Sequence, residues 1–125
     1  MKKILIVEDD IDIQNIFKII FKSYGYSVEC LTDGKKLCER QGDWPDAIIL
    51  DKQLPGLSGV EACQHLKSKE ETRNIPIIMI SAATGIEESA KKAGADDFLE
   101  KPFQMHVILK KISALMDNQQ ISTNP

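Results

Sequence analysis

The sequence predicts an α/β domain with a doubly wound, parallel five-stranded sheet and five helices. Short apolar runs alternate along the chain with segments whose apolar residues recur every three or four positions, the spacing of one helical face. The apolar runs are continuous, which is typical of parallel strands buried on both faces. Right-handed crossovers between such strands place helices on both sides of the sheet. In this architecture a functional site lies beyond the carboxyl ends of the strands, near the point where the strand order reverses.

The first half of the chain contains three of the predicted strands and two of the helices. The β-branched run at residues 4–7 predicts the first strand, and the apolar positions within residues 13–24 form one helical face that Gly25 is placed to end. A weaker strand at 27–31 leads through a turn at Asp33 and Gly34 to a short helix at 35–41. The loop GDWPD then precedes a strongly apolar strand at 47–50.

The second half continues the alternation. After the loop LPGLSG, the spacing of apolar residues predicts a helix at 60–67, and the next apolar run predicts a strand at 75–80 that contains Pro76 near its start. A helix rich in small residues follows at 86–93, then a short strand at 98–99 and an amphipathic helix at 105–116. We expect residues 1–117 to form one domain and residues 118–125 to be a disordered polar tail, because that segment lacks apolar periodicity.

Composition excludes several classes of protein. A chain of 125 residues with 42% hydrophobic residues fits one globular core. The net charge of −3, without a block of lysines, argues against direct binding to nucleic acid. The apolar run after Met1 is too short for a signal peptide or a membrane span, so we expect a cytoplasmic protein that does not bind a membrane. Three cysteines without CxxC spacing predict reduced thiols, with neither a disulfide framework nor a zinc site.

Charged side chains collect where the predicted strands end. Glu8, Asp9 and Asp10 follow the first strand, Asp51 follows the third, and Ser81 and Lys101 follow the fourth and the fifth. Two carboxylates about 4 Å apart repel by roughly 4 kcal/mol at an effective dielectric near 20, so a cluster of them requires a cation. Mg²⁺ fits because it prefers oxygen ligands, and Lys101 adds a second positive charge.

This set of groups predicts phosphoryl chemistry. A carboxylate flanked by a metal ion and a lysine can attack a phosphoryl group and form an acyl phosphate, because the cations neutralise charge on the transferring oxygens. The hydroxyl of Ser81 would donate to a third oxygen. Asp10 has a different predicted role, which is to cap the following helix by accepting a hydrogen bond from its first turn.

Four segments in order, ILIVEDD, AIILDKQLPGLSG, IPIIMISA and GADDFLEKPF, resemble the receiver domain of bacterial two-component response regulators. The resemblance covers about residues 2–116. It implies a flavodoxin-like sheet with strand order 2-1-3-4-5. It also implies that Asp51 accepts a phosphoryl group from a phosphohistidine on a sensor histidine kinase or a histidine phosphotransfer protein. Such a domain assists its own phosphorylation and dephosphorylation and is not an enzyme in the ordinary sense.

The resemblance also implies roles for the other residues at the predicted site. Glu8, Asp9, Asp51 and the main-chain carbonyl of Gln53 would hold Mg²⁺ or Mn²⁺. Ser81 and Lys101 match the family's hydroxyl and lysine positions, and the bond between Lys101 and Pro102 is typically cis in the family. Ser81 and Phe98 match the switch positions, although the second is often tyrosine.

The resemblance further suggests how a signal leaves the domain. Phosphorylation is expected to change the surface of the fourth helix, fifth strand and fifth helix, about residues 84–116, for a downstream protein or a second copy of the chain. The segment between Ser81 and Gly94 is about two residues shorter than is common in the family, so we expect a short fourth helix. No output domain follows in this sequence, and we expect a stand-alone receiver.

Three alternative functions would make different demands on these residues. An aspartyl phosphohydrolase would have a second acid two positions after the nucleophile, where Gln53 stands, and a flavin mononucleotide module would not place Glu8, Asp9 and Asp10 in its phosphate loop. A receiver-like scaffold that works without phosphorylation is the remaining alternative. Its usual mark is the loss of the acceptor, a metal carboxylate or the lysine, and this sequence keeps all three.

Overall fold

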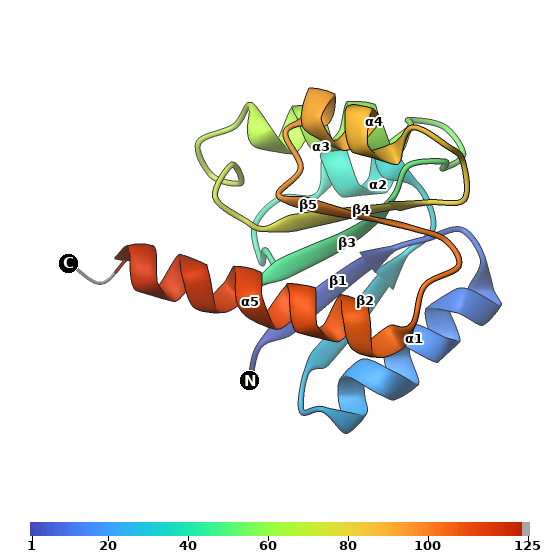
Figure 1. Ribbon diagram of the computed structural model, residues 1–125. Helices are drawn as coiled ribbons and strands as arrows, with labels where there is room; N and C mark the ends of the chain where they lie inside the picture. Colours follow the sequence, from blue (N-terminus) through green and yellow to red (C-terminus); the bar gives the residue numbers. More distant parts are fainter. Residues whose placement is uncertain (124–125) are drawn as a thin grey trace.

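The computed structural model describes the backbone of residues 1–123 and the side chains of residues 1–117. Within these residues, strands and helices alternate strictly along the chain (Figure 1). The strands are β1 (Lys3–Val7), β2 (Ser27–Leu31), β3 (Ala47–Asp51), β4 (Ile77–Ser81) and β5 (Asp97–Glu100). The helices are α1 (Ile11–Ser23), α2 (Gly34–Glu39), α3 (Gly59–Lys67), α4 (Ile86–Ala93) and α5 (Met105–Thr123).

All strand pairs of the sheet are parallel, and the strand order is β2-β1-β3-β4-β5. The predicted fold class and strand order are therefore confirmed. The order reverses between β1 and β3, since the chain first adds β2 on one side of β1 and then β3 on the other. The acidic residues Glu8, Asp9, Asp10 and Asp51 lie at or just after the carboxyl ends of these two strands.

Two apolar layers hold the helices against the sheet, with α1 and α5 on one face and α2, α3 and α4 on the other (Figure 1). Successive residues of a strand point to opposite faces. In β1, Leu5 and Val7 accordingly pack toward α2, α3 and α4, whereas Ile4 and Ile6 pack toward α1 and α5. All four side chains are fully buried, which explains why this strand reads as a continuous apolar run.

Local signals set the starts of the helices that lead away from the site. Asp10 caps α1, because its carboxylate accepts hydrogen bonds from the N–H groups of Asp12 at 2.9 Å and Ile13 at 3.3 Å. Ser58 caps α3 in the same way. The first residue of α3 must be glycine, because a Cβ atom on Gly59 would lie 2.1 Å from a main-chain oxygen at the end of β3.

Some predicted bounds differ from the structure. Strand β4 begins at Ile77, two residues later than predicted, because Pro76 has no N–H to give to a neighbouring strand and contributes only its carbonyl. The predicted apolar face of α1 was partly wrong: the buried positions are Gln14, Phe17 and Phe21, while Ile16 is exposed. Helix α4 has eight residues and is short, as expected.

The backbone of α5 continues as helix to Thr123, beyond the predicted end at residue 116 and into the segment expected to be a disordered tail. Glutamine favours helices, so the glutamines of this segment do not interrupt α5. The side chains of residues 118–125 lie outside the described residues. The domain boundary at residue 117 stays a prediction.

Candidate functional site

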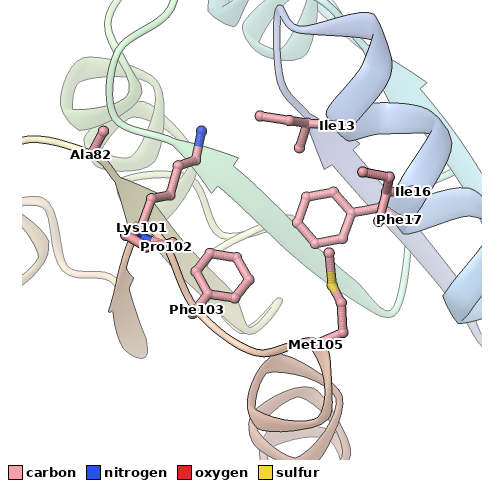
Figure 2. Close-up of a pocket in the computed structure, with 8 residues that line it drawn as sticks. All are labelled: Ile13, Ile16, Phe17, Ala82, Lys101, Pro102, Phe103 and Met105. Carbon is pink, nitrogen blue, oxygen red and sulfur yellow. The ribbon is translucent and has the colours of Figure 1, made fainter.

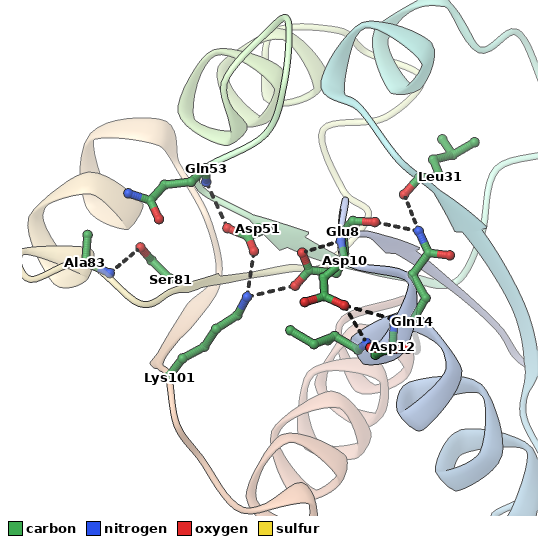
Figure 3. A network of polar contacts seen from close by, with 11 residues as sticks. Glu8, Asp10, Asp12, Gln14, Leu31, Asp51, Gln53, Ser81, Ala83 and Lys101 are labelled. Carbon is green, nitrogen blue, oxygen red and sulfur yellow. Dashed lines mark hydrogen bonds and ion pairs between the residues drawn. The ribbon is translucent and has the colours of Figure 1, made fainter.

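The predicted site residues come together at the carboxyl edge of the sheet (Figure 3). Glu8 directly follows β1, Asp51 ends β3, Ser81 ends β4 and Lys101 directly follows β5. Glu8, Asp51 and Ser81 are buried, and Lys101 is largely covered. Residues separated by most of the chain therefore meet because a parallel sheet brings the carboxyl ends of its strands to one edge.

Lys101 joins the two buried carboxylates. Its Nζ lies 2.7 Å from Oε1 of Glu8 and 2.7 Å from Oδ2 of Asp51. Hydrogen bonds from an ammonium group to carboxylates are charge-assisted and strong. The Glu8 side chain is 1% exposed, that of Asp51 5% and that of Lys101 20%, so water screens these charges only weakly.

Burial and charge shift the ionisation of this cluster. Burial raises the pKa of Glu8 from 4.5 to about 7, and the neighbouring Asp51 charge adds to the rise, while the hydrogen bond from Lys101 opposes it. Burial by itself lowers the pKa of Lys101, but the hydrogen bonds to Asp51 and Glu8 outweigh it, and the net shift is upward. Lys101 is therefore charged at neutral pH, whereas Glu8 is partly protonated there.

Three carboxylates are placed to share a metal ion. Oxygen atoms of Glu8, Asp9 and Asp51 all lie within 4.8 Å of one another, and Asp9 is the exposed member. The carboxylate of Asp10 points instead to its own helix start, as predicted. Carboxylate oxygens at one edge, open to solvent on the Asp9 side, fit Mg²⁺ or Mn²⁺, which take oxygen ligands and keep part of their water shell.

Main-chain contacts orient the remaining site residues. The Gln53 N–H donates to Oδ1 of Asp51 at 2.8 Å, so one oxygen of this carboxylate is held by the following loop and the other by Lys101. The Ser81 hydroxyl oxygen accepts a hydrogen bond from the Ala83 N–H at 3.0 Å. The Gln53 carbonyl as a metal ligand and the Ser81 hydroxyl as a phosphoryl donor stay predictions.

Two features near Lys101 were expected from the sequence. The peptide bond between Lys101 and Pro102 is cis, as predicted. Phe98 is half-buried on β5 and packs against the apolar layer of α2, α3 and α4. Its role as a switch stays a prediction.

An open, mostly apolar cleft of about 500 Å³ lies beside Lys101 (Figure 2). It runs between the start of α1 and the segment that joins β5 to α5. Lys101 is its charged residue. The apolar lining comes from Ile13, Ile16 and Phe17 on one side and from Pro102, Phe103 and Met105 on the other.

The family model of the response regulator receiver domain matches residues 4–113 of the chain. The chain belongs to the receiver domain family. Among curated relatives, the phosphate regulon transcriptional regulatory protein PhoB of Escherichia coli K12 is 34% identical over 92% of this chain and 52% of its own. The response regulator MprA of Mycobacterium leprae is 37% identical over 91% of this chain and 50% of its own. The chain thus spans about half the length of these relatives.

Solved receiver structures have the same fold and include magnesium complexes. The receiver domain of the sensor histidine kinase PA1611 of Pseudomonas aeruginosa, with a magnesium ion coordinated in its active site cleft, is 32% identical with a TM-score of 0.82. That comparison covers 93% of this chain and 98% of the other. The response regulator TrrA of Thermotoga maritima, in complex with Mg²⁺-BeF, is 27% identical with a TM-score of 0.81, and the comparison covers 92% and 99% of the two chains.

Membership of the family makes this chain a signalling domain of two-component systems with an acidic pocket, and not an enzyme of an ordinary class. No helix within the described residues is long and apolar enough to cross a membrane. Gln14, a buried amide at this edge of the sheet, was not among the predicted site residues. The signal in the sequence was the helical spacing of Gln14, which lies three positions before Phe17 and seven before Phe21 and so shares their buried face.

Proposed function

We propose that this receiver domain is a phosphorylation-dependent signalling switch in which Asp51 is the acceptor. The observation that carries the proposal is the position of Lys101, whose Nζ contacts Asp51 and Glu8 at 2.7 Å each within the buried end of the sheet. A structural ion pair with Lys101 would need only one carboxylate. The second carboxylate and that of Asp9 give the site acidic oxygens for which a divalent cation is the fitting partner.

The proposed reaction transfers a phosphoryl group from a phosphohistidine to Asp51. An oxygen of the Asp51 carboxylate forms a bond to phosphorus, the bond between phosphorus and the imidazole nitrogen breaks, and that nitrogen keeps the electron pair and takes a proton. Lys101 then pairs with an oxygen of the bound phosphoryl group, and Ser81 donates its hydroxyl proton to another. Mg²⁺ held by Glu8, Asp9, Asp51 and the Gln53 carbonyl would supply further neutralisation of the phosphoryl oxygens.

The proposed phosphodonor is a sensor histidine kinase or a histidine phosphotransfer protein, in the cytoplasm. The apolar cleft beside Lys101 supports this, because a protein that delivers a phosphohistidine to Asp51 must cover this edge of the sheet. Apolar side chains next to a charged group give such a partner both buried area and orientation. Receiver domains of sensor histidine kinases are among the solved structures that this chain resembles.

The proposed output is a change in the surface made by α4, β5 and α5, about residues 84–116, which then binds a downstream protein or a second copy of the chain. Phe98 on β5 is the proposed reporter of the phosphoryl group, because it lies one strand away from Ser81 in the sheet. Helix α4 starts at a left-handed glycine, Gly85, and has no side-chain cap. A short helix without this cap is the least costly element of the surface to move.

Transfer from a phosphorylated histidine phosphotransfer protein tests the proposal. The phosphoryl group of the donor carries a radioactive label. With Mg²⁺ present, this label should move to the wild-type chain within minutes and should be released by hydroxylamine, which cleaves acyl phosphates. Asp51→Asn should receive none, and Asp46→Asn, an exposed acid far from the site, should behave as wild type. Label on the Asp51→Asn protein would refute the acceptor assignment. No transfer to the wild type from kinase or phosphotransfer donors would favour a scaffold that works without phosphorylation.

A further inference from the structure

Gln14 is a polar residue on the core-facing side of α1 that the proposed phosphoryl chemistry does not use. It is 5% exposed, and the other buried residues of the helix are Phe17 and Phe21. An apolar residue at this position would continue the core. A buried amide in its place needs hydrogen-bond partners, because unpaired polar groups in the interior destabilise the fold.

The partners of Gln14 are main-chain carbonyls at the ends of two neighbouring strands (Figure 3). Its side-chain nitrogen donates to the carbonyl of Glu8, just after β1, and to the carbonyl of Leu31, the last residue of β2, at 3.4 Å. The Leu31 carbonyl also accepts the N–H of Glu8 at 3.0 Å. The main chain of Glu8 is therefore held on both sides, by β2 through its N–H and by α1 through its carbonyl.

The Glu8 carbonyl belongs to the peptide unit that leads into Asp9. Because this unit is planar, turning its carbonyl between the two Cα atoms changes the ψ angle of Glu8 and the φ angle of Asp9 together, and the φ angle helps to aim the Asp9 side chain. The carboxylates of Glu8 and Asp10 each accept a main-chain hydrogen bond. The Asp9 carboxylate accepts none within residues 1–117, so its direction depends on the backbone.

We propose that Gln14 is the positioning residue of the acidic cluster: it holds the peptide unit between Glu8 and Asp9 and so aims the Asp9 carboxylate toward Glu8 and Asp51. The effect of Gln14 on Mg²⁺ binding rests on the proposed metal site. Its hydrogen bonds to the main chain do not, because they need no metal. The two can therefore be tested separately.

The test compares Gln14→Met with the wild type. Methionine keeps the length and shape of the side chain and favours helix, but it donates no hydrogen bond. Gln64→Met is the matched control, because Gln64 is exposed on α3 and its amide donates to the Lys92 carbonyl on α4, not to a residue of the acidic cluster. Mg²⁺ is titrated while amide NMR signals are followed at a temperature well below unfolding. Gln14→Met should raise the Kd for Mg²⁺ by about tenfold, the size seen when a partner of a metal ligand is removed.

The second readout needs no metal. The three-bond coupling between the amide and α protons of Asp9 reports its φ angle, and it should move toward an averaged value in Gln14→Met while it stays at the wild-type value in Gln64→Met. A merely structural role would lower the unfolding temperature of Gln14→Met but leave the Kd and the coupling of the folded protein unchanged. That result would overturn the inference.

A third result separates this inference from the proposed function. If the wild type does not respond to Mg²⁺ while the Asp9 coupling still changes in Gln14→Met, the metal site is wrong and the positioning role stands. If Gln14→Met does not fold, Gln14→Asn takes its place, since its amide is one methylene short of the two carbonyls. Gln14→Asn should shift the coupling and the Kd in the same directions, and wild-type values for both would refute the role of Gln14.

Discussion

Replacing Glu8 by glutamine should stabilise the metal-free protein, and the gain should depend on pH. The structure raises the pKa of Glu8 from 4.5 to about 7, mainly by burial. One pKa unit corresponds to about 1.4 kcal/mol, so an ionised Glu8 lowers the free energy of unfolding by about 3 kcal/mol. Glutamine keeps the shape of the side chain and never ionises.

The direction of this pH dependence follows from the pKa values of Glu8 in the unfolded and the folded state. Below pH 4.5 Glu8 is protonated in both the folded and the unfolded state, so its ionisation has no effect on stability. Between pH 4.5 and about 7 the unfolded chain loses this proton first, and the wild type loses stability as the pH rises. Glu8→Gln should therefore match the wild type near pH 4.5 and exceed it by about 3 kcal/mol at pH 8.

Urea unfolding at pH 5 and pH 8, without metal, measures this difference. Glu70→Gln is the control, because Glu70 is exposed and should show no such pH dependence. Adding Mg²⁺ at pH 8 should reduce the advantage of Glu8→Gln, because binding stabilises the folded wild type. A difference of the same size at both pH values, or a variant less stable than the wild type at pH 8, would refute the assignment of a destabilising, buried charge to Glu8.

Three further predictions concern the same edge of the sheet. Asp9→Asn should weaken Mg²⁺ binding by tenfold or more in a titration, whereas Asp10→Asn should change it little, and equal losses would contradict the ligand assignment. Gly59→Ala should lower the free energy of unfolding by about 1 to 3 kcal/mol in urea, because the new Cβ would meet the main-chain oxygen of the acceptor aspartate; unchanged stability would show that the helix start can shift. Lys101→Met should raise the pKa of Glu8 above about 7 in a carboxyl NMR titration, because it removes the hydrogen bond that lowers it; a fall would mean that Lys101 does not neutralise this group.

The sequence was sufficient to predict β1, β3 and β4, because each contains a continuous apolar run, which is typical of a parallel strand buried on both faces. The apolar patterns of β2 and β5 are weaker. The sequence also predicted which residues would meet. Glu8, Asp51 and Lys101 each follow or end a parallel strand, and parallel strands share one carboxyl edge. The cap role of Asp10 was predictable for a similar reason, because it is a local interaction between adjacent residues.

Features that depend on three-dimensional contacts were not predictable from the sequence. Periodicity assigned Ile16 to the buried face of α1, but the rotation of the helix is set by its packing on the sheet, which buries Gln14 and leaves Ile16 half exposed. The simultaneous contact of Lys101 with Glu8 and Asp51 depends on side-chain direction across strands. The raised pKa of Glu8 depends on its degree of burial, which no local pattern reports.

The intact mass of the chain after incubation with a small phosphodonor tests the central claim most directly. The proposed function predicts one phosphoryl adduct on the wild type when Mg²⁺ is present, and none when a chelator removes the metal. Asp51→Asn should show no adduct under either condition, while Asp10→Asn should show the wild-type adduct. An adduct on Asp51→Asn, or an adduct on the wild type that is unaffected by the chelator, would contradict phosphorylation of Asp51 at a magnesium site.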